Sequence, residues 1–204
     1  MRWVGGGSGA GKTTIARRVA AVSGAALCST DDVMAEHARR LTAAEAPLLH
    51  AFREASMDDR WVTRSPAVML ESFHWFAGEG FSLITDDLAG ATANGSAVIA
   101  EGFRLLPHLV VPLLADRREA VWLLPTPEFR RAAFEQRGTV WEIASKTSDP
   151  ERALSNLLQR DRLFTDRLRT ELDDLGLQAI DVDICDSEDD VHERVIETLL
   201  PFER

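Results

Sequence analysis

Short apolar runs alternate along the chain with longer stretches in which apolar residues recur at helical spacing. The short runs predict strands, because a few consecutive apolar residues bounded by glycine or polar residues suit strands buried on both faces. The predicted strands cover residues 2–4, 25–28, 97–100, 120–124 and 178–182. Each is followed by a stretch that predicts a helix. This alternation predicts an α/β fold with a parallel sheet.

Helical spacing is clearest where a capping or stop signal accompanies it. Residues 12–22 place Ile15, Ala16, Val19 and Ala20 on one face. Helical segments fill residues 33–92, with Pro47 and Pro66 as starts. We expect residues 138–148 to form a loop.

Three further helices are predicted in the second half of the chain. Thr126 and Pro127 supply an N-cap and a first-turn proline for a helix that runs to about residue 136. A long helix runs from Asp149-Pro150 to about residue 175, where Gly176 stops it. Ser187 caps a final helix. Its predicted apolar face comprises Val191, Val195, Ile196 and Leu199.

A glycine-rich phosphate loop connects the first predicted strand to the first helix. The run Gly6-Gly7-Ser8-Gly9-Ala10-Gly11-Lys12-Thr13 matches G-x-x-x-x-G-K-[ST] in full. Glycines let backbone N–H groups turn toward a phosphate, and the helix N-terminus adds its positive end. We expect Lys12 to reach the β and γ phosphates of ATP or GTP and Thr13 to hold Mg²⁺. The predicted nucleotide-binding residues are Gly6, Gly7, Ser8, Gly9, Ala10, Gly11, Lys12, Thr13, Thr14 and Arg131.

Acidic residues follow the second and third predicted strands, at the same edge of the sheet. Asp31 or Asp32 would serve as a base that accepts a substrate proton, or hold Mg²⁺ through water. Alternatively, Asp31 only caps a helix over residues 33–41. Glu101 ends the apolar run at residues 98–100 in a loose Walker B pattern, which predicts a role in orienting Mg²⁺ or its water. Arg104, just beyond, is either a substrate ligand or a solvated loop residue.

Arginines are concentrated after the fourth predicted strand. Arg160 and its neighbour Asp161 lie at or inside the apolar stripe of the long helix, where charged residues need a reason. They form a buried ion pair, or Arg160 is delivered toward a phosphate. A mobile lid over about residues 137–150 would bring Arg137 to the transferring phosphoryl group. We therefore include Arg137 and Arg160 with Lys12, Asp31 and Asp32 as candidate catalytic residues.

The segment between the second and third strands is rich in aromatic residues and arginine. One interpretation is a helical core that packs on the sheet. The other is a wall for a planar substrate. On the second interpretation the substrate-binding residues are Arg60, Arg64, Phe73, Trp75, Glu101 and Arg104.

Composition narrows the possible partners. A formal net charge of −10 argues against broad nucleic-acid binding. No apolar run is long enough to span a membrane, and the glycine-rich start is unlike a signal peptide. Cys28 and Cys185 fit no metal motif, so we expect free thiols. We expect a cytoplasmic monomer or homodimer of one domain that acts on a small molecule.

The phosphate loop, the paired aspartates and Glu101-Gly102-Phe103-Arg104 together resemble the nucleotide-kinase-like P-loop family. That family includes adenylate kinase, shikimate kinase and the chloramphenicol phosphotransferases. The resemblance implies a five-stranded parallel sheet of order 2-3-1-4-5, a helical substrate-binding insert at about residues 33–92 and an arginine lid. It also implies a nucleotide base near residues 184–190. The Glu101 stretch is similar to the Asp-Gly-Phe-Pro-Arg of adenylate kinases, but it lacks the proline.

The carboxylate pair favours a hydroxyl acceptor, because a hydroxyl needs a base. The predicted activity is Mg²⁺-dependent transfer of the γ-phosphoryl of ATP or GTP to a small molecule. A hydroxylated or nucleoside-like antibiotic, inactivated by phosphorylation, is the acceptor that the resemblance suggests. Two alternatives are a nucleoside or nucleotide kinase of primary metabolism and a non-catalytic NTP-binding regulator. Residues 87–90 match the D-x-x-G of GTPases, but the chain has no Asn-Lys-x-Asp guanine motif.

Overall fold

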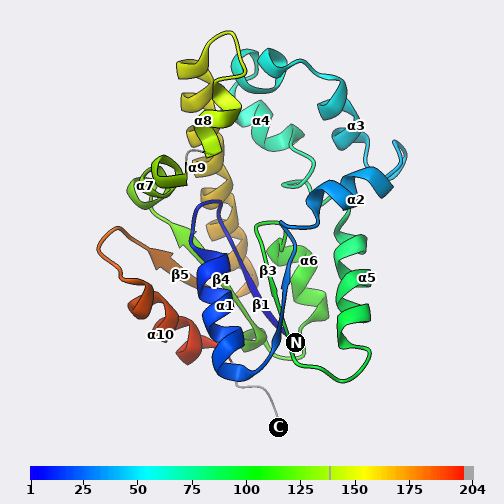
Figure 1. Cartoon of the computed structure of the whole chain (residues 1–204), viewed down its shortest axis with the longest axis vertical. Helices are drawn as coiled ribbons and strands as arrows, with labels where there is room; N and C mark the ends of the chain where they lie inside the picture. Colours follow the sequence, from blue (N-terminus) through cyan, green and yellow to red (C-terminus); the bar gives the residue numbers. More distant parts are fainter. Residues whose placement is uncertain (138, 200–204) are drawn as a thin grey trace.

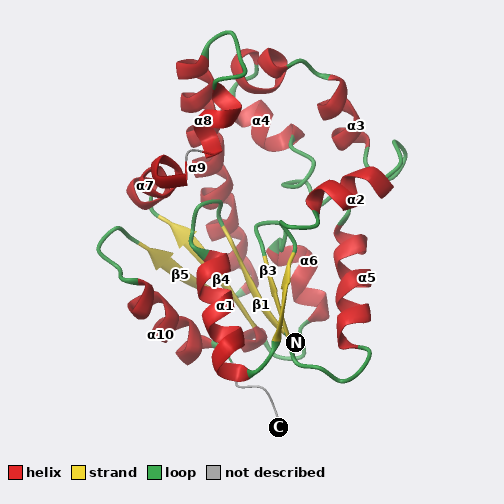
Figure 2. Ribbon diagram, in the orientation of Figure 1, coloured by secondary structure: helices red, strands yellow, loops and turns green. Residues whose placement is uncertain are grey.

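A parallel sheet of five strands forms the centre of the computed structural model (Figures 1 and 2). The model describes the backbone of residues 1–137 and 139–199, and their side chains except those of residues 137 and 139–141. The strands are β1 (Arg2–Gly6), β2 (Ala26–Ser29), β3 (Val98–Glu101), β4 (Ala120–Pro125) and β5 (Gln178–Val182). Their spatial order is β2-β3-β1-β4-β5, so the predicted α/β fold and strand order are confirmed.

Helices cover both faces of the sheet. On one face α1 (Lys12–Ser23) and α10 (Glu188–Thr198) bury residues such as Ile15 and Val195 against it. On the other face lie α5 (Phe81–Thr92), α6 (Pro107–Val110) and α9 (Pro150–Leu175), which bury residues such as Ile84 and Phe164. The short helices η2 (Val111–Leu113) and η3 (Arg117–Glu119) lead from α6 into β4.

Alternation along the strands explains why they are apolar throughout. In β4, Trp122 and Leu124 pack into the layer of α5, α6 and α9, whereas Val121 and Leu123 pack into the layer of α1 and α10. Successive side chains of a strand point to opposite faces, so a strand covered on both faces has no position for an exposed polar residue.

A group of short helices extends from the sheet between β2 and α5. It contains α2 (Met34–Arg40), α3 (Pro47–Glu54), the π-helical segment η1 (Asp59–Thr63) and α4 (Pro66–Ser72). Both α4 and η1 pack on α9, and α7 (Pro127–Arg137) and α8 (Thr139–Ala144) approach α9 from the side of β4. Figure 1 shows this insert on the same side of the sheet as the phosphate loop.

Most predicted helix boundaries are confirmed by capping contacts. The backbone N–H of Phe129 donates to Thr126 Oγ1 at 3.2 Å, and that of Arg152 donates to Asp149 Oδ1 at 3.0 Å. Ser187 caps α10 through Asp190. Gly176 ends α9 in the left-handed region, with φ of 61°. Pro47 and Pro66 are the first residues of α3 and α4.

Three expectations about these elements were wrong. Strand β1 continues through Gly5 and Gly6, which pair with Trp122 and Leu123 of β4. The two strands lie so close there that a Cβ on either glycine would collide. The loop expected at residues 138–148 contains helix α8. Ile196 is 41% exposed and lies off the buried face of α10. Among the described residues, no helix is both long and apolar enough to cross a membrane.

Candidate active site at the phosphate loop

The phosphate loop occupies the turn between β1 and α1. Gly9 and Gly11 have φ of 79° and 76°, a region that residues with a side chain rarely adopt. Gly6 has φ of 129°, and a Cβ there would lie 2.0 Å from the carbonyl oxygen of Leu123. The glycines of the motif are therefore required by the path of the backbone, which brings the loop to the N-terminus of α1.

Lys12 lies across this loop. Its side chain is buried, and its Nζ donates to the carbonyl oxygen of Gly7 at 2.9 Å. An ammonium group held in this way is placed next to the space that the loop encloses.

Thr13, the second residue of α1, contacts Glu101, the last residue of β3. Thr13 Oγ1 donates to Glu101 Oε1 at 3.1 Å. Glu101 is fully buried at the end of β3, and its Oε2 has no hydrogen-bond partner among the described residues. A buried carboxylate oxygen without a donor is costly. A hydroxyl, a carboxylate and the phosphates of a nucleotide are a ligand set that suits Mg²⁺, which keeps several waters.

Asp31 faces this group from the end of β2. Burial raises the pKa of Asp31. Lys12, a hydrogen bond from Thr30 and Arg104 act against that rise, whereas Glu101 adds to it. A Cβ on Gly102 would lie 2.8 Å from Asp31 Oδ1 and 1.9 Å from Thr30 Oγ1. Gly102 therefore lets the β2 and β3 ends approach each other closely.

The capping alternative for Asp31 is not what the structure contains. Helix α2 begins at Met34, and its N-cap is Val33, which makes no side-chain capping bond. Asp32 is exposed and lines a separate cavity of about 300 Å³ beside β2. Asp31 lies close enough to Lys12 and Glu101 for their charges to act on its pKa.

Arg104 belongs to a buried network that ties the insert to the sheet. Its guanidinium donates to the carbonyl oxygen of Thr30 at 3.2 Å and lies 4.1 Å from the centre of the Trp75 ring. It also lies 3.1 Å from His37 Nδ1, and His37 Nε2 lies 2.8 Å from Asp87 Oδ2. A guanidinium only donates, so His37 Nδ1 must accept and Nε2–H must donate to Asp87. The network positions the residue before Asp31.

Replacing His37 with phenylalanine should destabilise the protein by about 2–4 kcal/mol, because it removes one acceptor of the buried Arg104 guanidinium and the donor to Asp87. His37 is fully buried, and burial already lowers the pKa of Arg104 to about 10. Urea unfolding would measure the loss. The control is His192→Phe on α10, where the imidazole is only half-buried. Equal stability of the two variants would contradict this role for His37.

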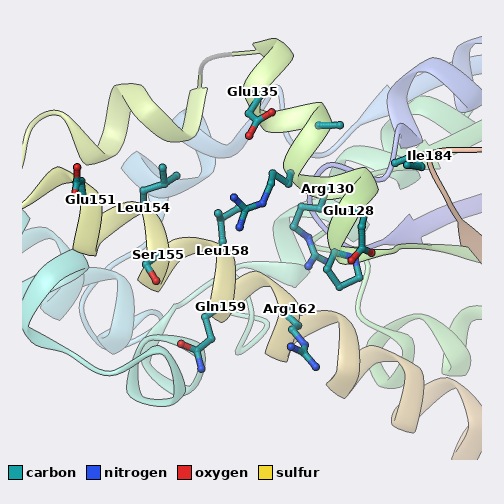
Figure 3. Close-up of a pocket in the computed structure, with 13 residues that line it drawn as sticks. Glu128, Arg130, Glu135, Glu151, Leu154, Ser155, Leu158, Gln159, Arg162 and Ile184 are labelled. Carbon is teal, nitrogen blue, oxygen red and sulfur yellow. The ribbon is translucent and has the colours of Figure 1, made fainter.

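Arg130, and not Arg131, contacts the phosphate loop. Its Nε donates to the carbonyl oxygen of Ser8 at 3.3 Å, and its terminal nitrogen donates to Thr165 Oγ1 on α9. Arg131 is exposed in a groove of about 690 Å³ between α7 and α9. Figure 3 shows Arg130 and Arg162 along this groove. The sequence offered no means to choose Arg130, because its role depends on the rotation of α7 about its axis.

The other predicted site residues lie away from the phosphate loop, in a small cavity or in the aromatic core, apart from Arg137. The side chain of Arg137 and the start of the expected lid are outside the described residues. Arg160 does not reach the phosphate loop. It pairs with Asp161, with its NH2 group 2.6 Å from Asp161 Oδ1, and lies 4.7 Å from the centre of the Phe73 ring. Arg60, Arg64 and Arg160 together line one small cavity. Phe73 and Trp75 pack with Phe52, His74, Phe76 and Phe103, so these rings are largely core.

A cavity of about 370 Å³ adjoins the phosphate loop on the side of α10. Gly9, Gly11 and Thr14 form one wall of it, and Phe129 and Gln136 of α7 form another. The turn after β5 and the start of α10, residues 186–188, close it. This is the neighbourhood in which the nucleotide base was expected.

No protein-family model matches the chain, and a comparison with curated proteins finds no match either. Among solved structures, the chain is similar to an uncharacterized protein from Eubacterium ventriosum ATCC 27560, with a TM-score of 0.48 and 15% sequence identity. The similarity covers 96% of this chain and 94% of that one.

Proposed function

We propose that the protein is a Mg²⁺-dependent phosphotransferase that moves the γ-phosphoryl group of ATP or GTP to a hydroxyl of a small molecule. The observation that carries the proposal is the grouping of Lys12, the Thr13–Glu101 pair and Asp31 around a complete phosphate loop. Each has the chemistry that one part of this reaction requires.

The nucleotide would lie with its phosphates in the loop and its base in the cavity beside α10. Backbone N–H groups of the loop and the N-terminus of α1 face the phosphates. Lys12 would exchange its bond to the Gly7 carbonyl for the β and γ phosphate oxygens, where negative charge must be stabilised during transfer.

Thr13 and Glu101 are the residues that would hold Mg²⁺, directly or through its waters. Bound there, the ion supplies charge neutralisation between the β and γ phosphates. The unpartnered Oε2 of Glu101 supports this assignment, because a buried carboxylate without a donor is better explained by a cation or its waters than by packing.

Asp31 would act as the base. It orients the acceptor hydroxyl and takes its proton as the hydroxyl oxygen forms a bond to the γ phosphorus. The bond from that phosphorus to the β–γ bridging oxygen breaks, and the nucleoside diphosphate leaves with its electron pair. The raised pKa of Asp31 makes it a stronger proton acceptor than an ordinary aspartate once it is ionised.

A screen with γ-labelled ATP and GTP over hydroxylated small molecules tests the proposal. The panel should include nucleosides, sugars, sugar phosphates and hydroxylated antibiotics. The expected result is Mg²⁺-dependent label in at least one acceptor. Label found only in inorganic phosphate with every acceptor would argue for an NTPase and against the kinase.

Glu101→Gln should raise the Mg²⁺ concentration needed for nucleotide binding by about 10-fold or more, because the amide keeps the bond from Thr13 but loses the charge. Nucleotide binding measured across a Mg²⁺ titration checks this. Glu36, exposed on α2, gives the matched control Glu36→Gln. An unchanged Mg²⁺ dependence in Glu101→Gln would remove Glu101 from the metal site.

A further inference from the structure

Three arginines converge on one small cavity in the insert. Arg60 comes from η1, Arg64 follows it and Arg160 comes from α9. The remaining wall is apolar or aromatic apart from Ser72. It consists of Phe52, Trp61, Met69 and Phe73. No carboxylate lines the cavity among the described residues, so like charges gather there without an acid on the wall.

The donors of this arginine cluster (Arg60, Arg64 and Arg160) are not all satisfied. The side chain of Arg160 is 8% exposed, and its NH1 group has no hydrogen-bond partner within the described part of the chain. The same holds for Nε of Arg60. Arg64 makes one long bond, from NH1 to Ser72 Oγ at 3.4 Å. Buried donors that lack acceptors are rare in folded proteins and are explained by an absent ligand or by water.

One carboxylate pairs with the cluster, and two others near it in the sequence accept from backbone N–H groups instead. Asp161 accepts from Nε and NH2 of Arg160. Glu79 accepts from the backbone N–H groups of Leu48 and Leu49, and Asp58 accepts from that of Ser148. With Asp161 counted against the three guanidinium groups, the cluster has a net charge of +2. It does so within a chain whose formal net charge is −10.

The positive field extends to His74. Burial, with a further contribution from the charges of Arg104, Arg53 and Arg160, lowers the pKa of His74 to about 4. His74 is therefore neutral at pH 7. Its Nδ1 is buried and has no partner among the described residues. This stretch of the insert has unused donors and positive charge, whereas Glu79 and Asp58 accept from backbone N–H groups.

We propose that Arg60, Arg64 and Arg160 form a subsite for the phosphate group of a phosphate monoester, which anchors the acceptor while a separate hydroxyl is phosphorylated. A phosphate dianion matches the charge of the cluster and accepts from several guanidinium groups at once. The anchor role rests on the proposed function, whereas phosphate binding by the cluster does not.

Contacts connect the cluster to the base. Arg160 lies over Phe73, Phe73 contacts His74 with ring centres 4.8 Å apart, and His74 contacts Trp75 at 4.5 Å. Trp75 in turn packs on Arg104, which binds the carbonyl oxygen of Thr30 beside Asp31. The aromatic segment thus joins the arginine cluster to the end of β2 through a continuous series of packed side chains.

The present cavity has a volume of about 10 Å³, about the space for the centre of one water molecule. A phosphate enters only if guanidinium groups move apart as they bind it. Arg60 and Arg64 are half-buried and can do so more easily than Arg160. The insert should therefore change its local packing on binding phosphate.

Titration of inorganic phosphate into Lys12→Ala protein tests the subsite, because that variant removes binding at the phosphate loop. Calorimetry should detect phosphate binding in Lys12→Ala. A second change, Arg160→Met, should weaken it about 10-fold or more, the loss expected for a charged hydrogen bond. Arg162→Met, two residues along α9 and exposed, is the matched control and should leave the affinity unchanged. Acetate in place of phosphate should bind more weakly.

Arg160→Met leaves Asp161 without its partner, so Arg64→Met in the Lys12→Ala background is the second variant, with urea unfolding to check that both are folded. Absence of phosphate binding in Lys12→Ala overturns the subsite. Equal affinity in the Arg64 variant and the Arg162 control also overturns it. Phosphate binding that depends on Arg64, in a wild-type protein that fails to bind Mg-nucleotide, would keep the subsite and reject the proposed kinase.

Discussion

Lys12→Ala is expected to lower phosphoryl transfer by about 10²- to 10³-fold or more, the loss typical when a group that stabilises developing charge is removed. The fold should survive, because the hydrogen bond from the ammonium group to the Gly7 carbonyl oxygen lies within the loop itself and not in the apolar core. Turnover with γ-labelled nucleotide and a thermal unfolding curve measure the two effects.

Arg17→Ala provides the matched control for Lys12. Arg17 lies on the same helix, is exposed, and loses the same charge on substitution. Turnover of Arg17→Ala should stay near that of the wild type. If Lys12→Ala turned over as fast as Arg17→Ala, the phosphate loop would not be the catalytic centre.

Asp31→Asn should lower turnover by about 10²-fold or more while nucleotide affinity stays nearly constant. The amide keeps the size of the side chain but cannot accept the hydroxyl proton. Asp32→Asn should be much milder, since Asp32 is exposed in a separate cavity. Steady-state kinetics on both variants separate them. Equal losses in both, or none in either, would contradict the assignment of Asp31 as base.

Asp31→Asn should also stabilise the folded protein at neutral pH. The raised pKa of Asp31 means that folding favours its protonated form. The stability from that preference is present below the unfolded pKa and is lost as pH rises through the folded pKa. Asp31→Asn should therefore raise the free energy of unfolding at pH 7, and the gain should shrink as pH falls. Wild-type turnover should rise with pH as Asp31 ionises, with a midpoint above the ordinary value of 3.8.

The sequence predicts the fold well because local signals agree with the tertiary arrangement. Helix α9 has clear limits, since Asp149 caps its start and Gly176 ends it. Prediction failed where packing decided the result. Gly5 and Gly6 look like loop residues, but they pair with Trp122 and Leu123 of β4, where a Cβ on either glycine would collide.

The candidate site is predictable only in part. A phosphate loop has a sequence signature, so Lys12 and Thr13 are identified directly. The choice of Asp31 over Asp32 depends on which carboxylate the β2 end turns toward Glu101, and no local pattern encodes that turn. Arg104 was expected to be either a substrate ligand or a solvated loop residue, and the structure buries it against His37 and Thr30. That pairing joins residues far apart in sequence.

Titration with non-hydrolysable analogues of ATP and GTP, with and without Mg²⁺, is the most direct test that a nucleotide site exists here. We expect the wild-type protein to bind at least one analogue, and to bind it more tightly with Mg²⁺. Lys12→Ala should weaken binding, and Glu101→Gln should weaken its Mg²⁺ dependence. Absence of binding of either analogue to wild-type protein, or equal binding by Lys12→Ala, would contradict it.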